Sequence, residues 1–165
     1  MYQNFDKMST QSRIWIYQAD RKLTAKEENI AAYSLKEAVQ SWASHGSALL
    51  GSVDVIDSRF LVIALDEHEN AASGCSIDSS THWVKELGKK LGVDFFDRSL
   101  AYIDGKETRT IPVFSVRKAI ENGAIDANTI VYNNTISNLQ GLVSNWKIPA
   151  EQLTFIKRYF KKEVA

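Results

Sequence analysis

The sequence predicts an α+β fold, a ferredoxin-like β-α-β-β-α-β sandwich, on three observations. The chain has 165 residues, of which 44% are hydrophobic and 24% charged, enough to bury a sizeable core. Segments with strand and helix patterns follow one another in the order strand, helix, strand, strand, helix, strand. Residues 13–18 and 59–65, the first and third strands, are apolar on both faces, which suits the two central positions of such a sheet.

The first helix is expected over residues 25–44, after the first strand. Thr24 and Glu27 have the spacing of a capping box, which favours a helix start. A second box-like spacing leaves open a kink near Tyr33. The pair His45-Gly46 would end the helix, because glycine tolerates the left-handed conformation that closes many helices.

The second and third strands read as a hairpin. Residues 49–56 alternate, with Ser52 and Asp54 interposed, which is typical of a strand with one wet face. The turn between this strand and residues 59–65 would be Asp57-Ser58, a weaker turn signal than Asn-Gly.

An acidic, small-residue loop, residues 66–74, leads into the second helix. Ser76, Asp78 and Ser79 are candidate N-caps for this helix, and Gly92 would close it. A fourth strand is expected at residues 99–103.

Three further parts complete the expected organisation. Asp104-Gly105 predicts an added β-hairpin with residues 108–113 as its return strand. Residues 114–165 are interpreted as a helical C-terminal extension packed on the core in one domain. It would hold an extra strand near 129–132 and a last helix that starts at Pro149.

Residues 1–12 have no apolar run and are expected to form a flexible lead-in before the core at 13–113. Met1 and Met8 both remain possible starts.

Charge and cysteine content restrict the partners. Twenty basic and twenty acidic residues give zero formal net charge, which disfavours nucleic acid as a partner. No apolar run reaches about 18 residues, so no transmembrane helix is expected, and the zero net charge predicts no membrane partner. The single cysteine excludes an intrachain disulfide and suits a cytoplasmic location.

The expected topology places a candidate site at one end of the sheet. There the C-terminal end of the first helix would lie beside the N-terminal end of the second, since packed helices lie about 8–10 Å apart. Cys75 and His45 are the candidate nucleophile and base. The candidate ligand-binding residues are Trp42, Gly46, Gly74, Ser76, Asp78, Ser79 and Arg98.

Each candidate has a plain structural interpretation as well. A lone cysteine in such a loop is most often a small buried side chain. The hydroxyl-rich segment 73–80 could hold a small anion, but a helix cap needs the same residue types. The acidic run at residues 66–69 matches no metal-site spacing, so no metal is predicted. Lys157, Arg158, Lys161 and Lys162 form a basic run that is usually solvated.

Several motifs resemble those of a family of short bacterial proteins whose function is uncharacterised. They are W-x-x-H-G at residues 42–46, A-S-G-C-S-I-D-S-S at 72–80 and F-D-R at 96–98. The family's members are sometimes labelled transporter ATPases, although this sequence has no G-x-x-x-x-G-K-[ST] phosphate-binding loop. The resemblance implies a bacterial, cytoplasmic protein and no particular cofactor.

The leading functional hypothesis is a small binding or protein-interaction module with its site at the His45/Ser73–Ser80 end of the sheet. Its partner would be a small anion or a protein, and homo-oligomerisation stays open. The alternative is a thiol-dependent enzyme in which Cys75 attacks and His45 acts as base.

Overall fold

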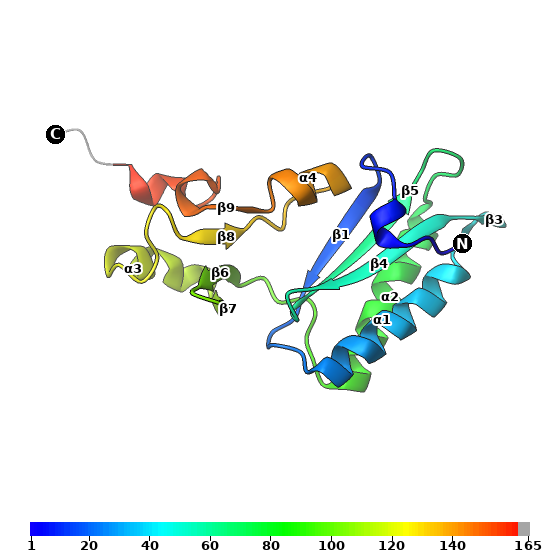
Figure 1. Cartoon of the computed structure of the whole chain (residues 1–165), viewed down its shortest axis with the longest axis horizontal. Coiled ribbons are helices and arrows are strands. Elements are labelled where there is room, and N and C mark those ends of the chain that lie inside the picture. The colour runs from blue at the N-terminus through cyan, green and yellow to red at the C-terminus, as the bar shows by residue number, and fades with distance from the viewer. Residues whose placement is uncertain (162–165) are drawn as a thin grey trace. The chain divides into compact units, whose positions relative to one another are not determined.

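The structure is a computed structural model that describes residues 1–161, and it contains both helices and strands (Figure 1). The chain forms two compact units. The first unit comprises Met1–Asp97 and Ser137–Leu142, and the second comprises Arg98–Ile136 and Val143–Ala165. The α+β class is therefore confirmed, while the unit boundary lies at Asp97/Arg98 and not after residue 113 as expected. That the two units act as a single domain stays a prediction.

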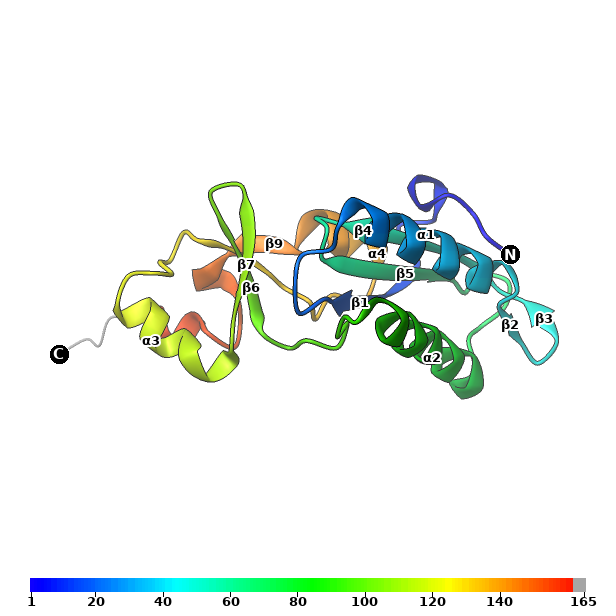
Figure 2. The same cartoon turned by 90° about the horizontal axis from the view of Figure 1, so that it is seen from below.

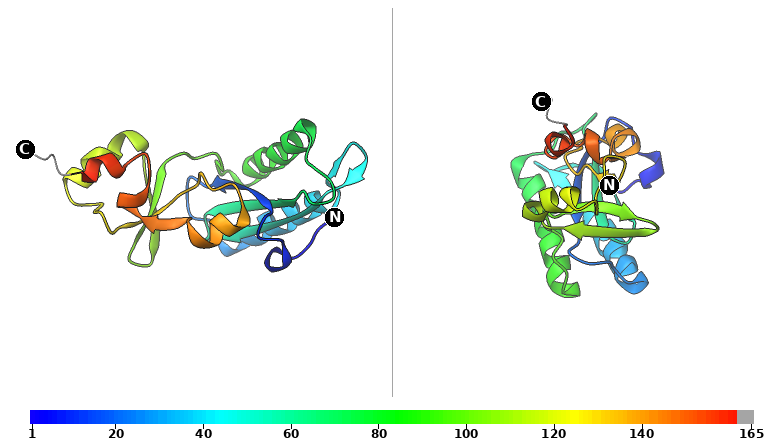
Figure 3. Two further views of the ribbon diagram at one scale, coloured as in Figure 1. Left: turned by 90° about the horizontal axis from the view of Figure 1, so that it is seen from above. Right: turned by 90° about the vertical axis from the view of Figure 1, so that its left-hand side faces the viewer.

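The first unit is built on a three-stranded antiparallel sheet in the order β1-β5-β4. Its strands are β1 (Arg13–Gln18), β5 (Phe60–Asp66) and β4 (Leu50–Ile56). The central strand β5 is buried along nearly its whole length, as its apolar sequence predicts. Helices α1 (Ala25–Gln40) and α2 (Gly74–Leu91) lie on the same side of this sheet (Figure 3).

The four-stranded ferredoxin-like sheet is not formed. Strand β6 (Leu100–Asp104), which was expected to pair with β1, belongs to a separate sheet in the second unit. After α2 the chain makes only one bridge to β1, between Phe96 and Gln18, before it leaves the first unit. β1 is therefore an edge strand, and the apolar side chain of Leu100 is instead buried in the second unit's core.

Helix α1 begins as predicted, with a capping box between Thr24 and Glu27, and continues without a break past Tyr33. It ends at Gln40, four residues earlier than expected, because the following chain turns inward. Trp42 is only 2% exposed. Strands β2 (Ala43–Ser44) and β3 (Ser47–Ala48) then form a small hairpin.

The pair His45-Gly46 makes the turn of that hairpin and does not close the helix. Both residues have positive φ, +50° and +82°, which is the backbone of a tight two-residue hairpin turn. Gly46 therefore has the left-handed conformation that was expected, but it lies in a hairpin turn and not at the end of a helix.

Local signals at the other turns are confirmed. Asp57 and Ser58 lie in the β4–β5 turn with φ of +54° and +53°, but the turn also includes Arg59, because Ile56 pairs with Phe60. Gly92 closes α2 with φ of +64°. The N-cap of α2 is Ser73, so the helix starts before the three caps that the sequence suggested.

Residues 1–12 differ from the flexible lead-in that was expected. Tyr2 bridges to Gly51 on the edge of β4, and a short 3-10 helix, η1, spans Phe5–Lys7. Met8 is buried, and Tyr2 packs on the first unit's core. These two apolar side chains, together with backbone hydrogen bonds between Gln3 and Gly51 and between Gly51 and Met1, hold the segment against the sheet.

The second unit has its own sheet and core. The sheet order is β7 (Glu107–Ile111), β6, β8 (Ile130–Tyr132) and β9 (Lys147–Pro149). The hairpin β6–β7, visible in Figure 2, confirms the expected hairpin, although its two turn residues are Gly105 and Lys106 because Asp104 pairs with Glu107. Strand β8 confirms the extra strand. Helix α3 (Val116–Glu121) packs on this unit's apolar cluster.

The remainder of residues 114–161 is less helical than predicted. Helix α4 (Leu139–Ser144) is short, and η2 (Val113–Ser115), η3 (Ala150–Gln152) and η4 (Lys157–Phe160) are 3-10 turns. Pro149 does not begin a last helix. It ends the edge strand β9, where a residue without a backbone N–H is tolerated.

Within residues 1–161, no helix is long and apolar enough to cross a membrane.

Candidate functional site

The predicted corner exists between the end of α1 and the start of α2. The indole Nε1 of Trp42, just after α1, donates a buried 2.9 Å hydrogen bond to the carbonyl oxygen of Ser76 in α2. The Trp42 ring also packs edge-on against Trp83 and Trp15, with centroid distances of 5.3 and 6.2 Å. Trp42 therefore fixes the corner from inside and is not available as a ligand-binding surface.

The hydroxyl groups of the Ser73–Ser80 loop are largely used by the helix cap. The Ser73 N–H donates to Ser76 Oγ at 2.8 Å, and the Ser76 N–H donates to Ser73 Oγ at 3.2 Å. Ser79 Oγ donates to the carbonyl oxygen of Cys75 at 2.9 Å. The residues that could have formed an anion site are thus already hydrogen-bonded to the helix.

The candidate nucleophile and base are both on the surface. Cys75 is exposed in the first turn of α2, and His45 is exposed at the tip of the β2–β3 hairpin, beside Gly46. No hydrogen bond joins the Cys75 thiol to the His45 imidazole in the part of the chain that the structure describes. The activating contact that a thiol nucleophile needs is therefore absent from this geometry.

The other predicted residues are dispersed. Gly74 is the first residue of α2, and no atom lies within 4 Å of the position that its Cβ would take. Asp78 is exposed one turn further along the helix. Arg98 is exposed but is the first residue of the second unit.

The acidic run after β5 is a hydrogen-bonded turn. Asp66 Oδ1 accepts from the N–H of His68 at 2.9 Å, and Glu67 Oε2 accepts from the N–H of Ala72 at 3.0 Å. Glu67 also pairs with Arg13 at 3.6 Å. Among residues 1–161, no three side chains of the metal-binding types come together.

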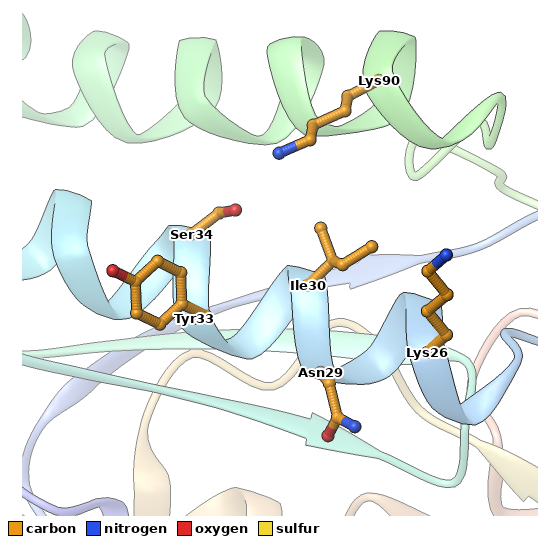
Figure 4. A pocket seen from close by; sticks show the side chains of 6 residues that line it. All are labelled: Lys26, Asn29, Ile30, Tyr33, Ser34 and Lys90. Carbon is orange, nitrogen blue, oxygen red and sulfur yellow. The ribbon is translucent and has the colours of Figure 1, made fainter.

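A groove that was not among the predicted sites lies between the same two helices, at the opposite end from the corner (Figure 4). Its volume is about 530 Å³. It is formed by the N-terminal half of α1 and the C-terminal end of α2, and its lining residues are Lys26, Asn29, Ile30, Tyr33, Ser34 and Lys90. Both walls belong to the first unit.

The groove combines cationic and hydroxyl groups over an apolar floor. Figure 4 shows the Ile30 side chain between the helices, with the Lys90 ammonium and the Ser34 hydroxyl pointing into the space above it. The Tyr33 side chain is 68% exposed, high for an aromatic residue. Concave sites with a few converging polar groups are where proteins usually bind ligands.

One feature of the sequence could have identified this groove. Lys26, Ile30 and Ser34 are spaced four residues apart and therefore share one face of α1. That face lies beside the buried stripe of Ala31 and Leu35, so an apolar residue on it indicated a second contact surface.

Comparison with protein-family models, with curated proteins and with solved structures gave no match. The resemblance to the family of short bacterial proteins therefore stays a prediction.

Proposed function

We propose that the protein is a non-catalytic binding module whose first unit holds an anionic group of its ligand in the α1–α2 groove. The observation that carries this proposal is that Lys26 and Lys90 face one groove from two helices. Neither forms an ion pair among the described residues. By contrast, the neighbouring Arg21 and Lys89 are paired with Glu27 and Glu86, at 2.7 and 2.9 Å.

Two ammonium groups that lack ion-pair partners among the described residues favour a negatively charged ligand. Two like charges that share a groove repel each other, and a carboxylate or phosphate between them replaces repulsion with two attractions. The exposed Tyr33 ring and the Ile30 side chain would then contact the apolar part of the ligand.

The His45/Ser73–Ser80 corner would form the second contact of the same surface. α1 is 16 residues long, about 24 Å at 1.5 Å per residue, so the groove and the corner lie within the reach of one peptide. What supports this extension is that Cys75 and His45 are both exposed there.

The test is charge reversal in the groove. Lys26→Glu and Lys90→Glu should abolish binding of a short oligoglutamate peptide and of inorganic phosphate, measured by titration calorimetry. Lys7→Glu is the matched control, since it changes the net charge equally at an exposed lysine in η1. If wild-type protein binds neither probe, or if all three variants bind equally, the groove is not the site.

A thiol-dependent enzyme is the second candidate, and the exposure of Cys75 at the start of α2 favours it. Alkylation by iodoacetamide as a function of pH tests this function. A native thiol that reacts no faster than the unfolded one at pH 6 to 7, or equally fast in His45→Ala, argues against an activated nucleophile.

We also propose that the first unit is a ferredoxin-like fold that lacks its fourth strand, and that the protein works in a bacterial cytoplasm. The element order from β1 to α2 supports the first proposal. The motif resemblance and the single unpaired cysteine support the second.

A further inference from the structure

The zero net charge of the chain hides two oppositely charged units. The first unit carries ten basic and fourteen acidic residues, a formal charge of −4. The second carries ten basic and six acidic residues, a formal charge of +4. The net charge of the whole chain argued against nucleic acid and anionic membranes as partners, but the second unit by itself has a net positive charge that attracts such surfaces.

The second unit also exposes three consecutive apolar residues directly after β7. Pro112 and Val113 are exposed, the latter at 51%, and Phe114 is 89% exposed. Phe114 is the most exposed large hydrophobic side chain among the described residues. The next residues inward, Val116 and Ala119, fill the core face of α3, so Phe114 lies outside that face.

Basic residues follow this apolar segment along α3 and occur in an element that packs on the same cluster. Arg117 and Lys118 lie one turn beyond Phe114 on the exposed side of α3. Arg117 pairs with Glu121 at 2.9 Å, whereas Lys118 has no ion pair in the described part of the chain. The turn η4, which contributes to the same apolar cluster as α3, adds exposed Lys157 and Arg158.

We propose that the second unit binds the surface of an anionic phospholipid bilayer, with the Phe114 side chain inserted among the head groups. A protruding apolar segment beside lysines has the composition of an interfacial anchor. Anionic head groups attract the cations, and the lipid accepts the ring without a preformed pocket. A single-stranded nucleic acid could stack on Phe114, but it offers nothing to the aliphatic Pro112 and Val113.

This inference is independent of the groove in the first unit, because it uses only residues 112–118 and η4. One inserted ring and a few cations give weak and reversible binding, much less than the two signals that stable anchoring requires. The attraction should fall as salt rises, since the Debye length shortens from about 10 Å at 0.1 M to 3 Å at 1 M.

The experiment is co-sedimentation of the full chain with phosphatidylglycerol/phosphatidylcholine vesicles and with phosphatidylcholine vesicles. Binding is expected to the anionic vesicles and to fall in 1 M salt. Phe114→Ala should lower the partition coefficient about tenfold, the loss of one buried aromatic side chain. Lys118→Glu should lower it several-fold.

Val143→Ala is the matched control, because Val143 is 83% exposed on the same unit but lies outside the 112–118 segment. It should bind like the wild type. Phe114→Trp should keep binding and shift its fluorescence to shorter wavelength on the anionic vesicles. Equal binding to both vesicle types, no loss in Phe114→Ala, or preference for an oligothymidylate competitor over vesicles would overturn the proposal.

Discussion

Gly88 lies in α2, the helix that contributes to both the groove and the corner. At this residue α2 packs most closely on the chain segment that follows it. A Cβ at this position would lie 2.6 Å from the carbonyl oxygen of Val93 and 3.6 Å from the ring of Phe95. The close approach arises because Gly92 reverses the chain and the Val93 N–H returns to the Gly88 carbonyl at 3.0 Å. We therefore predict that Gly88→Ala destabilises the first unit.

The magnitude follows from two opposing effects. Overpacking a close contact costs about 1–3 kcal/mol, and the upper half of that range applies because the opposing atom is backbone. Replacing glycine by alanine inside a helix stabilises the folded state by about 1 kcal/mol, because alanine has the higher helix propensity. The net loss is about 1–2 kcal/mol, and each kcal/mol lowers Tm by about 4–8 °C in a unit of this size.

Urea denaturation followed by circular dichroism measures this loss. Gly74→Ala is the control on the same helix, since no atom lies within 4 Å of its added Cβ. It should leave stability unchanged or raise it by about 0.5–1 kcal/mol. If Gly88→Ala is as stable as Gly74→Ala, the packing of α2 on the Val93 segment is not as described.

Three further predictions concern turns and titrating groups. Ser58→Gly should raise stability by about 0.5–1 kcal/mol, because Ser58 has φ of +53° and glycine adopts that conformation without strain; a lower urea midpoint would contradict this. The hydrogen bond from Arg21 and that from the Thr24 N–H lower the pKa of Glu27 to about 2, so its stabilisation is complete above pH 4.5 and lost as pH falls toward 2. Glu27→Gln should flatten this acid limb of the wild-type stability profile. Burial raises the pKa of Asp54, so Asp54→Asn should be more stable than wild type at neutral pH, with the difference shrinking as the solution is acidified.

Local signals in the sequence predicted local structure well. Thr24, Gly92 and the Asp57-Ser58 turn act through the residues beside them, so their spacing was sufficient evidence. The corner was also predictable, because it depends only on the order from β1 to α2. That order holds although the complete fold was assigned incorrectly.

The sheet that β6 joins could not be predicted in the same way. A strand's partner is chosen by the core that buries its side chains, and Leu100 is buried in the second unit's cluster, with residues such as Val131 and Ile156. Those partners lie 31 to 56 residues away along the chain, beyond any short-range pattern. The charge separation was missed for a different reason: the charge was counted over the whole chain, and that count averages two oppositely charged units.

The corner and the groove differ in whether their polar side chains already interact with other parts of the protein. Ser, Asp and Gly at a helix start serve a cap and an anion site equally well, so composition cannot separate the two roles. In this chain Ser73 and Ser76 already bond to each other and to the helix backbone. Lys26 and Lys90, on the same helix pair, form no ion pair among the described residues. A ligand gains most where charge is unpaired before it arrives, and this favours the groove as the first contact and the corner as its extension.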